Sequence, residues 1–175
     1  MKKRTRAREL TLQFLYQLDL CGDELYPEAG AWLRSEERDA ETLRFATRLV
    51  EGVWEHWEEI ERTVQAVAQN WNIARMAVID RNVLRLGTYE LLHCPDIPAK
   101  VAVNEAIELG KRFSTANSGA FINGILDKIM NRKPAAKPEE AAVRDEQLAR
   151  TAPQPEGETD VLPESDERPE AAQRG

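Results

Sequence analysis

The chain has 175 residues, 42% of them apolar and 31% charged, which is enough for one ordinary domain with a hydrophobic core. No stretch approaches the roughly eighteen consecutive apolar residues of a transmembrane helix, and the basic N-terminus lacks the apolar segment of a secretion signal, so the composition predicts a soluble, cytoplasmic protein. Two cysteines, Cys21 and Cys94, are too few to staple such a domain and are expected to be free thiols.

Charge is distributed unevenly along the chain. Residues 133–175 hold six basic and eleven acidic residues, so −5 of the net charge of −7 lies there, together with six of the nine prolines and no aromatic residue. A segment of this composition cannot bury enough apolar surface to offset its ordering entropy, and we predict a disordered acidic tail. The first eight residues contain no acid and five cations, which we call the basic arm: Lys2, Lys3, Arg4, Arg6 and Arg8.

The first half of the chain contains helical patterns. Apolar residues recur at helical spacing from Thr5 to Leu20, which predicts an amphipathic helix that begins in the basic arm. Cations at a helix N-terminus oppose the helix dipole, so a ligand explains them better than fold stability does. A short helix after Pro27 is expected to turn Trp32 and Leu33 inward.

Asp39 is a suitable N-cap for a long apolar pattern that ends near Trp71, and the length of this pattern predicts a break between His56 and Glu59. The four tryptophans of this half are expected in the core and between helices. The polar stretch from Asn70 to Asn72 then indicates a boundary.

The second half predicts three more helical patterns. One runs from Met76 to a stop at Cys94-Pro95, the next spans Val101–Phe113, and a polar turn at residues 114–118 leads to the last, whose inner face includes Ile125. No segment alternates with a strand period for long enough to compete. The sequence therefore predicts an all-α body of residues 1–132, with six or seven helices in two packed small bundles divided near Trp71.

Motifs for catalysis are absent from the sequence. There is no glycine-rich phosphate loop, no Gly-x-Ser-x-Gly elbow and no cysteine or histidine pair at metal-ligand spacing, which predicts a protein that is not an enzyme and has no metal site and no cofactor. Neither His56 nor His93 has a partner that suggests a triad. Glu105 and Glu108 could form a carboxylate pair, but an exposed polar helix face explains them equally well.

The remaining polar and aromatic residues are of the types that bind single-stranded RNA. Cations pair with phosphates, amides read base edges and aromatic rings stack on bases. Beyond the basic arm, the candidates are Tyr16, Lys111, Arg112, Phe121, Asn123 and Lys128. An alternative stays open at this level: the three helix cations could be solvated faces, and Phe121 could belong to the core.

The chain resembles the NusB family of bacterial transcription antitermination factors from about residue 4 to residue 130. The matching segments are the basic start at residues 6–9, Asp80-Arg81, Tyr89 to Leu91, the VAVNEAIELGK run at residues 101–111, and residues 121–128. The resemblance implies an all-helical fold and a non-enzymatic role. It also implies that the protein binds boxA RNA with the ribosomal protein NusE and joins the RNA polymerase antitermination complex, mainly on ribosomal RNA operons.

Carried over residue by residue, the resemblance adds Asn117 and Ser118 to the RNA-facing set, and makes Asp80, with Arg81 beside it, the expected contact with the protein partner. Two alternatives remain. One is the NusB-like domain at the front of some RNA methyltransferases, which requires a catalytic domain downstream. The other is a protein-interaction adaptor, such as a homodimer in which the arm and the Phe121 region are buried against a second copy.

Overall fold

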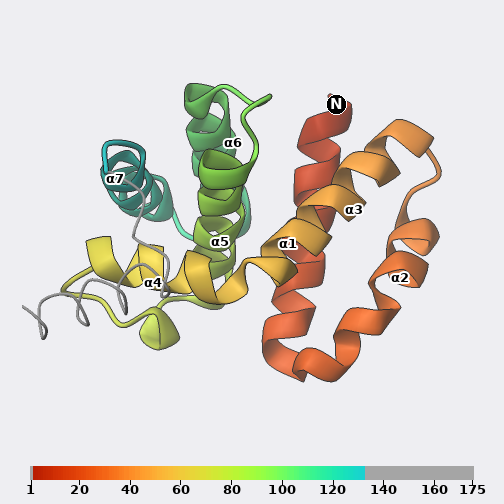
Figure 1. Ribbon diagram of the computed structural model, residues 1–175, viewed down its shortest axis with the longest axis horizontal. Helices are drawn as coiled ribbons and strands as arrows, with labels where there is room; N and C mark the ends of the chain where they lie inside the picture. The colour runs from red at the N-terminus through yellow and green to blue at the C-terminus, as the bar shows by residue number, and fades with distance from the viewer. Residues whose placement is uncertain (1, 133–175) are drawn as a thin grey trace, which may run out of the picture. The chain divides into compact units, whose positions relative to one another are not determined.

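The computed structural model describes residues 2–132, and all the regular structure in that range is helical (Figure 1). The predicted all-α fold is confirmed, with seven α-helices and two short 3-10 helices among the described residues. The predicted acidic tail, residues 133–175, lies outside this range. In chain order the elements are α1 (Lys3–Cys21), η1 (Asp23–Glu28), α2 (Ala29–Glu36), α3 (Ala40–Glu55), α4 (Trp57–Val67), η2 (Ile73–Arg75), α5 (Val78–His93), α6 (Ala99–Phe113) and α7 (Ser118–Met130).

Local chemistry explains several helix boundaries. The carboxylate of Asp39 caps α3 by accepting hydrogen bonds from the backbone N–H and the hydroxyl of Thr42, at 2.9 and 2.8 Å, and these bonds lower the pKa of Asp39 to about 2. Gly22 ends α1 with a φ of +95°, a conformation that glycine adopts without strain. The predicted break in the long apolar pattern is present at His56, which separates α3 from α4.

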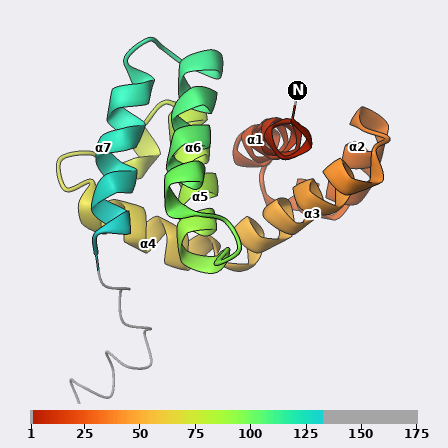
Figure 2. The same ribbon diagram turned by 90° about the horizontal axis from the view of Figure 1, so that it is seen from above.

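The helices form two groups within the described body (Figure 2). One group contains α1, α2 and α3, and the other is built from α4, α6 and α7 around α5, which also packs against α1 and α3. Because α4 packs against α5 and α7 more than against α3, the division falls at His56 and not near Trp71. The polar stretch at Asn70–Asn72 is a connection inside the second group, so polarity alone placed the boundary too late in the chain.

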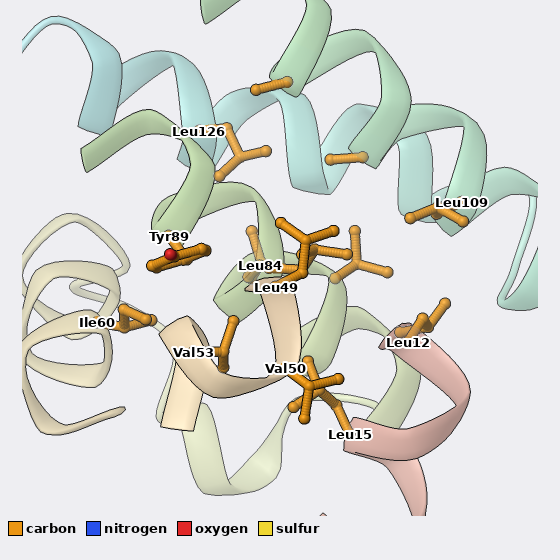
Figure 3. Close-up of a cluster of buried hydrophobic side chains, with 14 of the residues drawn as sticks. Leu12, Leu15, Leu49, Val50, Val53, Ile60, Leu84, Tyr89, Leu109 and Leu126 are labelled. Atoms are coloured by element: carbon orange, nitrogen blue, oxygen red, sulfur yellow. The ribbon is translucent and has the colours of Figure 1, made fainter. Parts of the chain in front are cut away.

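A single hydrophobic core joins the two groups (Figure 3). The close-up shows buried apolar side chains of both groups in one cluster: Leu12 and Leu15 from α1, Leu49, Val50 and Val53 from α3, Ile60 from α4, Leu84 and Tyr89 from α5, Leu109 from α6 and Leu126 from α7. Helix α3 approaches α5 so closely at Gly52 that an added Cβ atom would overlap the Tyr89 ring. Within residues 2–132, no helix combines the length and the apolar character needed to cross a bilayer.

Candidate RNA-binding surface

The basic arm occupies the first turns of α1, and its outer cations are accessible. Lys2, Lys3 and Arg4 are all exposed. The Lys3 ammonium lies 3.1 Å from a carboxylate oxygen of Asp39 and 2.9 Å from one of Glu41. Ion pairs between exposed side chains contribute little free energy, so the Lys3 ammonium can leave these carboxylates for an RNA phosphate at small cost.

Arg8 is not part of that accessible set, and the fold does not expose it for the predicted contact with RNA. Its side chain is 2% exposed, and its guanidinium donates to the two carboxylate oxygens of Glu90 at 2.7 and 2.9 Å. Glu90 is equally buried, and burial raises its pKa although the bonds from Arg8 lower it. The pair holds α1 against α5, so Arg8 cannot turn outward without leaving a buried carboxylate unpaired.

Glu9 pairs with two further arginines, Arg6 on its own helix and Arg112 on α6. Its carboxylate is 4% exposed and accepts hydrogen bonds from Arg112 and, at 3.5 Å, from Arg6. Arg6 is also 3.6 Å from Glu37 and is only partly exposed, whereas the Arg112 side chain remains 55% exposed. Arg112 can therefore keep its bond to α1 and still present guanidinium N–H groups to a phosphate.

A hollow of about 760 Å³ lies between the start of α1 and α6. The two helices run in the same direction here, because Thr5 bonds to Glu105 at 3.1 Å and Glu9 bonds to Arg112 further along both helices. Several side chains around the hollow are exposed cations, namely Lys2, Lys111 and Arg112. Its acids include Glu9 and Glu105, which already have internal partners.

Tyr16 lies about two helical turns beyond Glu9 on the same helix. It is 38% exposed and borders a smaller hollow of about 240 Å³. The other residues of this hollow are Leu12, Gln13, Gln17, Ile79 and Phe113. Along α1 the arm thus comes first, Glu9 with the bonded Arg112 of α6 comes next, and the Tyr16 ring comes last.

The family resemblance placed Asn117 and Ser118 together in the RNA-facing set, but the turn between α6 and α7 exposes only one of the two side chains. Asn117 is exposed and makes no side-chain cap bond, so its amide is free to bind a ligand. Ser118 is 2% exposed, and its hydroxyl oxygen accepts a hydrogen bond from the backbone N–H of Thr115 at 3.2 Å and lies 3.0 Å from the hydroxyl of Ser114. The Ser118 side chain therefore stabilises the turn and is not exposed for the predicted contact with RNA.

Helix α7 presents its predicted RNA residues on two different flanks. Phe121 and Lys128 are seven residues apart, which is two helical turns, and both border a hollow of about 690 Å³ next to α4. Asn123 instead shares a face with Gly119, four residues earlier, where an added Cβ atom would lie 3.0 Å from the side chain of Lys111 in α6. The structure therefore brings Asn123 to the flank of Lys111 and away from Phe121.

Trp71 is a functional candidate that the sequence assigned to the core. Its side chain is 58% exposed and meets the partly buried Phe121 edge to face, with ring centroids 5.7 Å apart. The other tryptophans, Trp32, Trp54 and Trp57, pack against the core as expected. The signal that distinguishes Trp71 is its setting between Asn70 and Asn72, which is typical of a loop and not of a buried helix face.

The residues expected to contact a protein partner differ in their availability. The guanidinium of Arg81 donates to both carboxylate oxygens of Asp19 at 2.6 and 2.7 Å and to the Ala74 carbonyl at 3.1 Å, which fastens α5 to α1. Asp80 is half-buried, and its Oδ1 atom is enclosed without a hydrogen-bond partner among residues 2–132. Arg81 is thus bonded within the fold, whereas Asp80 keeps an enclosed carboxylate oxygen that accepts no hydrogen bond from the described residues.

Comparison with known proteins gives a consistent family match. Residues 5–131 match the model described as the NusB family. The chain is 48% identical over 134 residues to the transcription antitermination protein NusB of Myxococcus xanthus, which covers 74% of this chain and 95% of that protein. It is similar to the structure of T. maritima NusB, with a TM-score of 0.68 and 36% identity over 80% of this chain and 96% of that one. It is also similar to a chain in a crystal structure of antitermination factors NusB and NusE in complex with dsRNA, with a TM-score of 0.64 and 28% identity over 74% and 97% of the two chains.

Proposed function

The chain belongs to the NusB family, and we propose that it is a non-enzymatic transcription antitermination factor that binds boxA-type RNA together with the ribosomal protein NusE. Two comparisons support this role. The relative from Myxococcus xanthus carries the name of a transcription antitermination protein, and this chain covers nearly all of it. A structural neighbour contains NusB, NusE and dsRNA. The corresponding place of action is the cytoplasm, in the RNA polymerase antitermination complex, mainly on ribosomal RNA operons.

The observation that carries the RNA-binding part is the row of accessible cations along α1 and α6. Lys2, Lys3 and Arg4 are exposed at the start of α1, and Arg112 keeps more than half of its side chain exposed. Each cation that pairs with a phosphate releases condensed counterions, which is the main source of affinity for nucleic acid. These residues therefore supply affinity for the RNA backbone and little sequence preference.

In this proposal two separate aromatic surfaces recognise bases, one at Tyr16 on α1 and one beside α7. Tyr16 offers an exposed ring beside the polar side chains of Gln13 and Gln17. At α7, the partly buried Phe121 and the exposed Trp71 present a second aromatic surface, with the Lys128 ammonium bordering the same hollow. Stacking on aromatic rings contributes roughly 1–3 kcal/mol per base.

Titration of a labelled boxA-like RNA with the full-length protein tests the proposal. We expect tighter binding when NusE is present, and a steep loss of affinity with salt. If the three exposed arm cations contact three phosphates, a slope of about −0.7 per phosphate predicts a roughly 20-fold loss between about 50 and about 200 mM KCl from the arm alone. The matched control for replacing arm cations by alanine is Arg34→Ala, which removes an exposed cation from α2 and leaves this surface intact.

The same experiment separates the proposal from a protein-interaction adaptor. A homodimer held by apolar contacts would show little salt dependence and would appear as a dimer in sedimentation. RNA binding that is weak, insensitive to salt and unaffected by NusE would overturn the proposal and favour the adaptor. The methyltransferase alternative receives no support from the comparisons quoted above, because the Myxococcus xanthus relative is covered over 95% of its length and is named as an antitermination protein.

A further inference from the structure

Three potential metal ligands, two from the start of α4 and one from the end of α5, meet at one end of α5. His56 lies between α3 and α4, Glu59 is in the first turn of α4, and His93 is the last residue of α5. One ligand atom from each lies within 4.8 Å of the other two. The Nε2 atom of His93 is 2.9 Å from Oε2 of Glu59, and Nδ1 of His56 is 3.9 Å from the same oxygen. We propose that these three side chains bind a divalent transition-metal ion, with Zn²⁺ as the best match.

The donor set supports this assignment. Two imidazole nitrogens and one carboxylate oxygen are the ligands of a known class of three-residue zinc sites, in which water completes the tetrahedron. Softer ions such as Cu⁺ prefer sulfur and Mg²⁺ prefers oxygen, so a mixed nitrogen and oxygen set favours Zn²⁺ and its neighbours in the first transition series. The proposal concerns binding, since nothing beside the cluster indicates a substrate.

The geometry requires only a local adjustment. Bonds of about 2.0–2.2 Å to a tetrahedral ion place ligand atoms roughly 3.3–3.6 Å apart. The atoms that are now up to 4.8 Å apart must therefore approach by about an ångström, whereas the Glu59 and His93 atoms, now 2.9 Å apart, must separate by about half an ångström. The rings of His56 and His93 are now stacked, with centroids 3.8 Å apart and planes 14° from parallel. A metal ion lies in the plane of each imidazole that binds it, so one ring must rotate. His93 already directs a nitrogen at Glu59, which makes His56 the ring that turns, and the second side-chain torsion of histidine is soft.

The surroundings of the cluster favour a cation. A hollow of about 520 Å³ opens beside it, and its lining includes Asp23, Glu55, Glu58 and Glu59 as acids against a single base, Arg62. Such an excess of carboxylates raises the local concentration of divalent ions.

Binding at this place would join the two groups of helices. The ion would connect the break between α3 and α4 to the C-terminal end of α5, and so would fix the junction at which the fold divides. The cluster shares no residue with the candidate RNA-binding surface. A loss of zinc binding would therefore leave the RNA affinity of the NusB-type site unchanged, and the two proposals can fail separately.

Zinc titration of the tag-free, chelator-treated full-length protein tests the proposal by calorimetry, with ZnCl₂ as the probe. We expect one ion per chain and a melting temperature that rises with zinc concentration, because an ion that binds only the folded state stabilises it. Glu59→Gln and His93→Gln should each weaken zinc binding by at least about tenfold, the smallest loss typical of perturbed zinc sites. His56→Asn is the third variant, and all three must melt like the parent without zinc.

The matched control is Glu58→Gln. Glu58 lines the same hollow, and its replacement removes the same charge one residue away from Glu59. Retained affinity in Glu58→Gln with loss in Glu59→Gln supports coordination over simple attraction. Equal binding by the parent and all three cluster variants would overturn the proposal and place the ion elsewhere, for example at the exposed Cys21 thiol. A parent that binds no zinc would also overturn it, leaving the cluster as a hydrogen bond between α4 and α5.

Discussion

Arg4 and Arg8 lie about one helical turn apart on α1, and their replacement by alanine should affect different properties, namely RNA binding for Arg4 and folding stability for Arg8. Arg4 is exposed, with its guanidinium 4.8 Å from the centre of the Phe45 ring, whereas Arg8 is 2% exposed and bonded to Glu90. Arg4→Ala should leave the fold intact and weaken binding to every RNA, with a salt slope that is shallower by roughly 0.7 for single-stranded RNA. Arg8→Ala should instead act on folding.

The expected loss of folding stability in Arg8→Ala follows from the buried carboxylate of Glu90, which is left without its partner. Two charge-assisted hydrogen bonds of 2.7 and 2.9 Å are lost, and Glu90, which is 2% exposed in the parent, loses the guanidinium that it contacts. Removing one partner of a buried ion pair costs about 3–5 kcal/mol, a large part of the 5–15 kcal/mol stability of an ordinary domain. Glu105, 3.8 Å from Arg8, loses a neighbouring cation as well but is partly solvated.

The cost of Arg8→Ala should depend on pH with a defined sign. Burial raises the pKa of Glu90 in the folded state, and Arg8 is the main group that lowers it, so the variant should raise it further. Between the unfolded and the folded pKa the native state then binds more protons than the unfolded state, and stability falls as pH rises. The variant should be least destabilised near pH 5 and most destabilised near pH 8, as measured by urea titration of parent and variant at about these two values.

The double variant Arg8→Met/Glu90→Leu provides the decisive control. Replacing both partners of a buried pair by apolar side chains of similar size is often neutral or stabilising, so it should recover most of the stability that Arg8→Ala loses. If Arg8→Ala unfolds at the same urea concentration as the parent at both pH values, the pair does not hold α1 to α5. If the single and double variants are equally unstable, the loss comes from packing and not from the unpaired carboxylate.

Three further substitutions test other parts of the structure. Phe121→Ala should weaken RNA binding by roughly 1–3 kcal/mol without changing the salt slope, because stacking releases no counterions; an altered slope, or a melting temperature well below the parent's, would show that Phe121 serves another purpose. Ile125→Ala should destabilise the fold by about 2–5 kcal/mol in denaturant titration, since Ile125 is 6% exposed on the inner face of α7, and a near-neutral result would contradict that assignment. Gly52→Ala should cost about 1–3 kcal/mol or more, because its Cβ atom would overlap the buried Tyr89 ring; a stable variant would mean that α3 can move away from α5.

The fold was predictable because most of its determinants are local. Apolar residues at helical spacing, the cap at Asp39 and the break at His56 all act within a few residues, and each is where the sequence indicated. The division between the two helix groups depends on which helices α4 packs against, a property of tertiary contacts. The polar residues around Trp71 mark a loop correctly but contain no information on which group the loop belongs to.

The candidate site was only partly predictable. Its polar residue types can be read from the sequence, but whether each side chain is exposed or buried depends on the tertiary fold. Arg8 is four residues before Leu12 and seven before Leu15, two buried positions of α1, so its phase already pointed inward. An arginine on that stripe needs a buried acid, and Glu90, which lies between Tyr89 and Leu91 in the sequence, provides it. Ser118 offered no such signal, since its hydroxyl is turned inward by the geometry of the turn.

The burial of Arg8 and the pairing of Arg6 lower the salt dependence that is expected for RNA binding by the basic arm. The five cations of the basic arm would give a slope of about −3.5 if each neutralised one phosphate of a single strand. Arg8 is buried against Glu90 and Arg6 is held between Glu9 and Glu37, which leaves three cations and a slope of about −2 from the arm. The joint replacement of the three accessible cations by alanine should therefore reduce the slope of the parent by about 2, and adding Arg6→Ala should change it little further. A fall of about 3.5 on replacing all five cations in a protein that still folds would mean that Arg6 and Arg8 leave their carboxylates when RNA binds, and that the free energy of RNA binding exceeds the cost of breaking the buried pair.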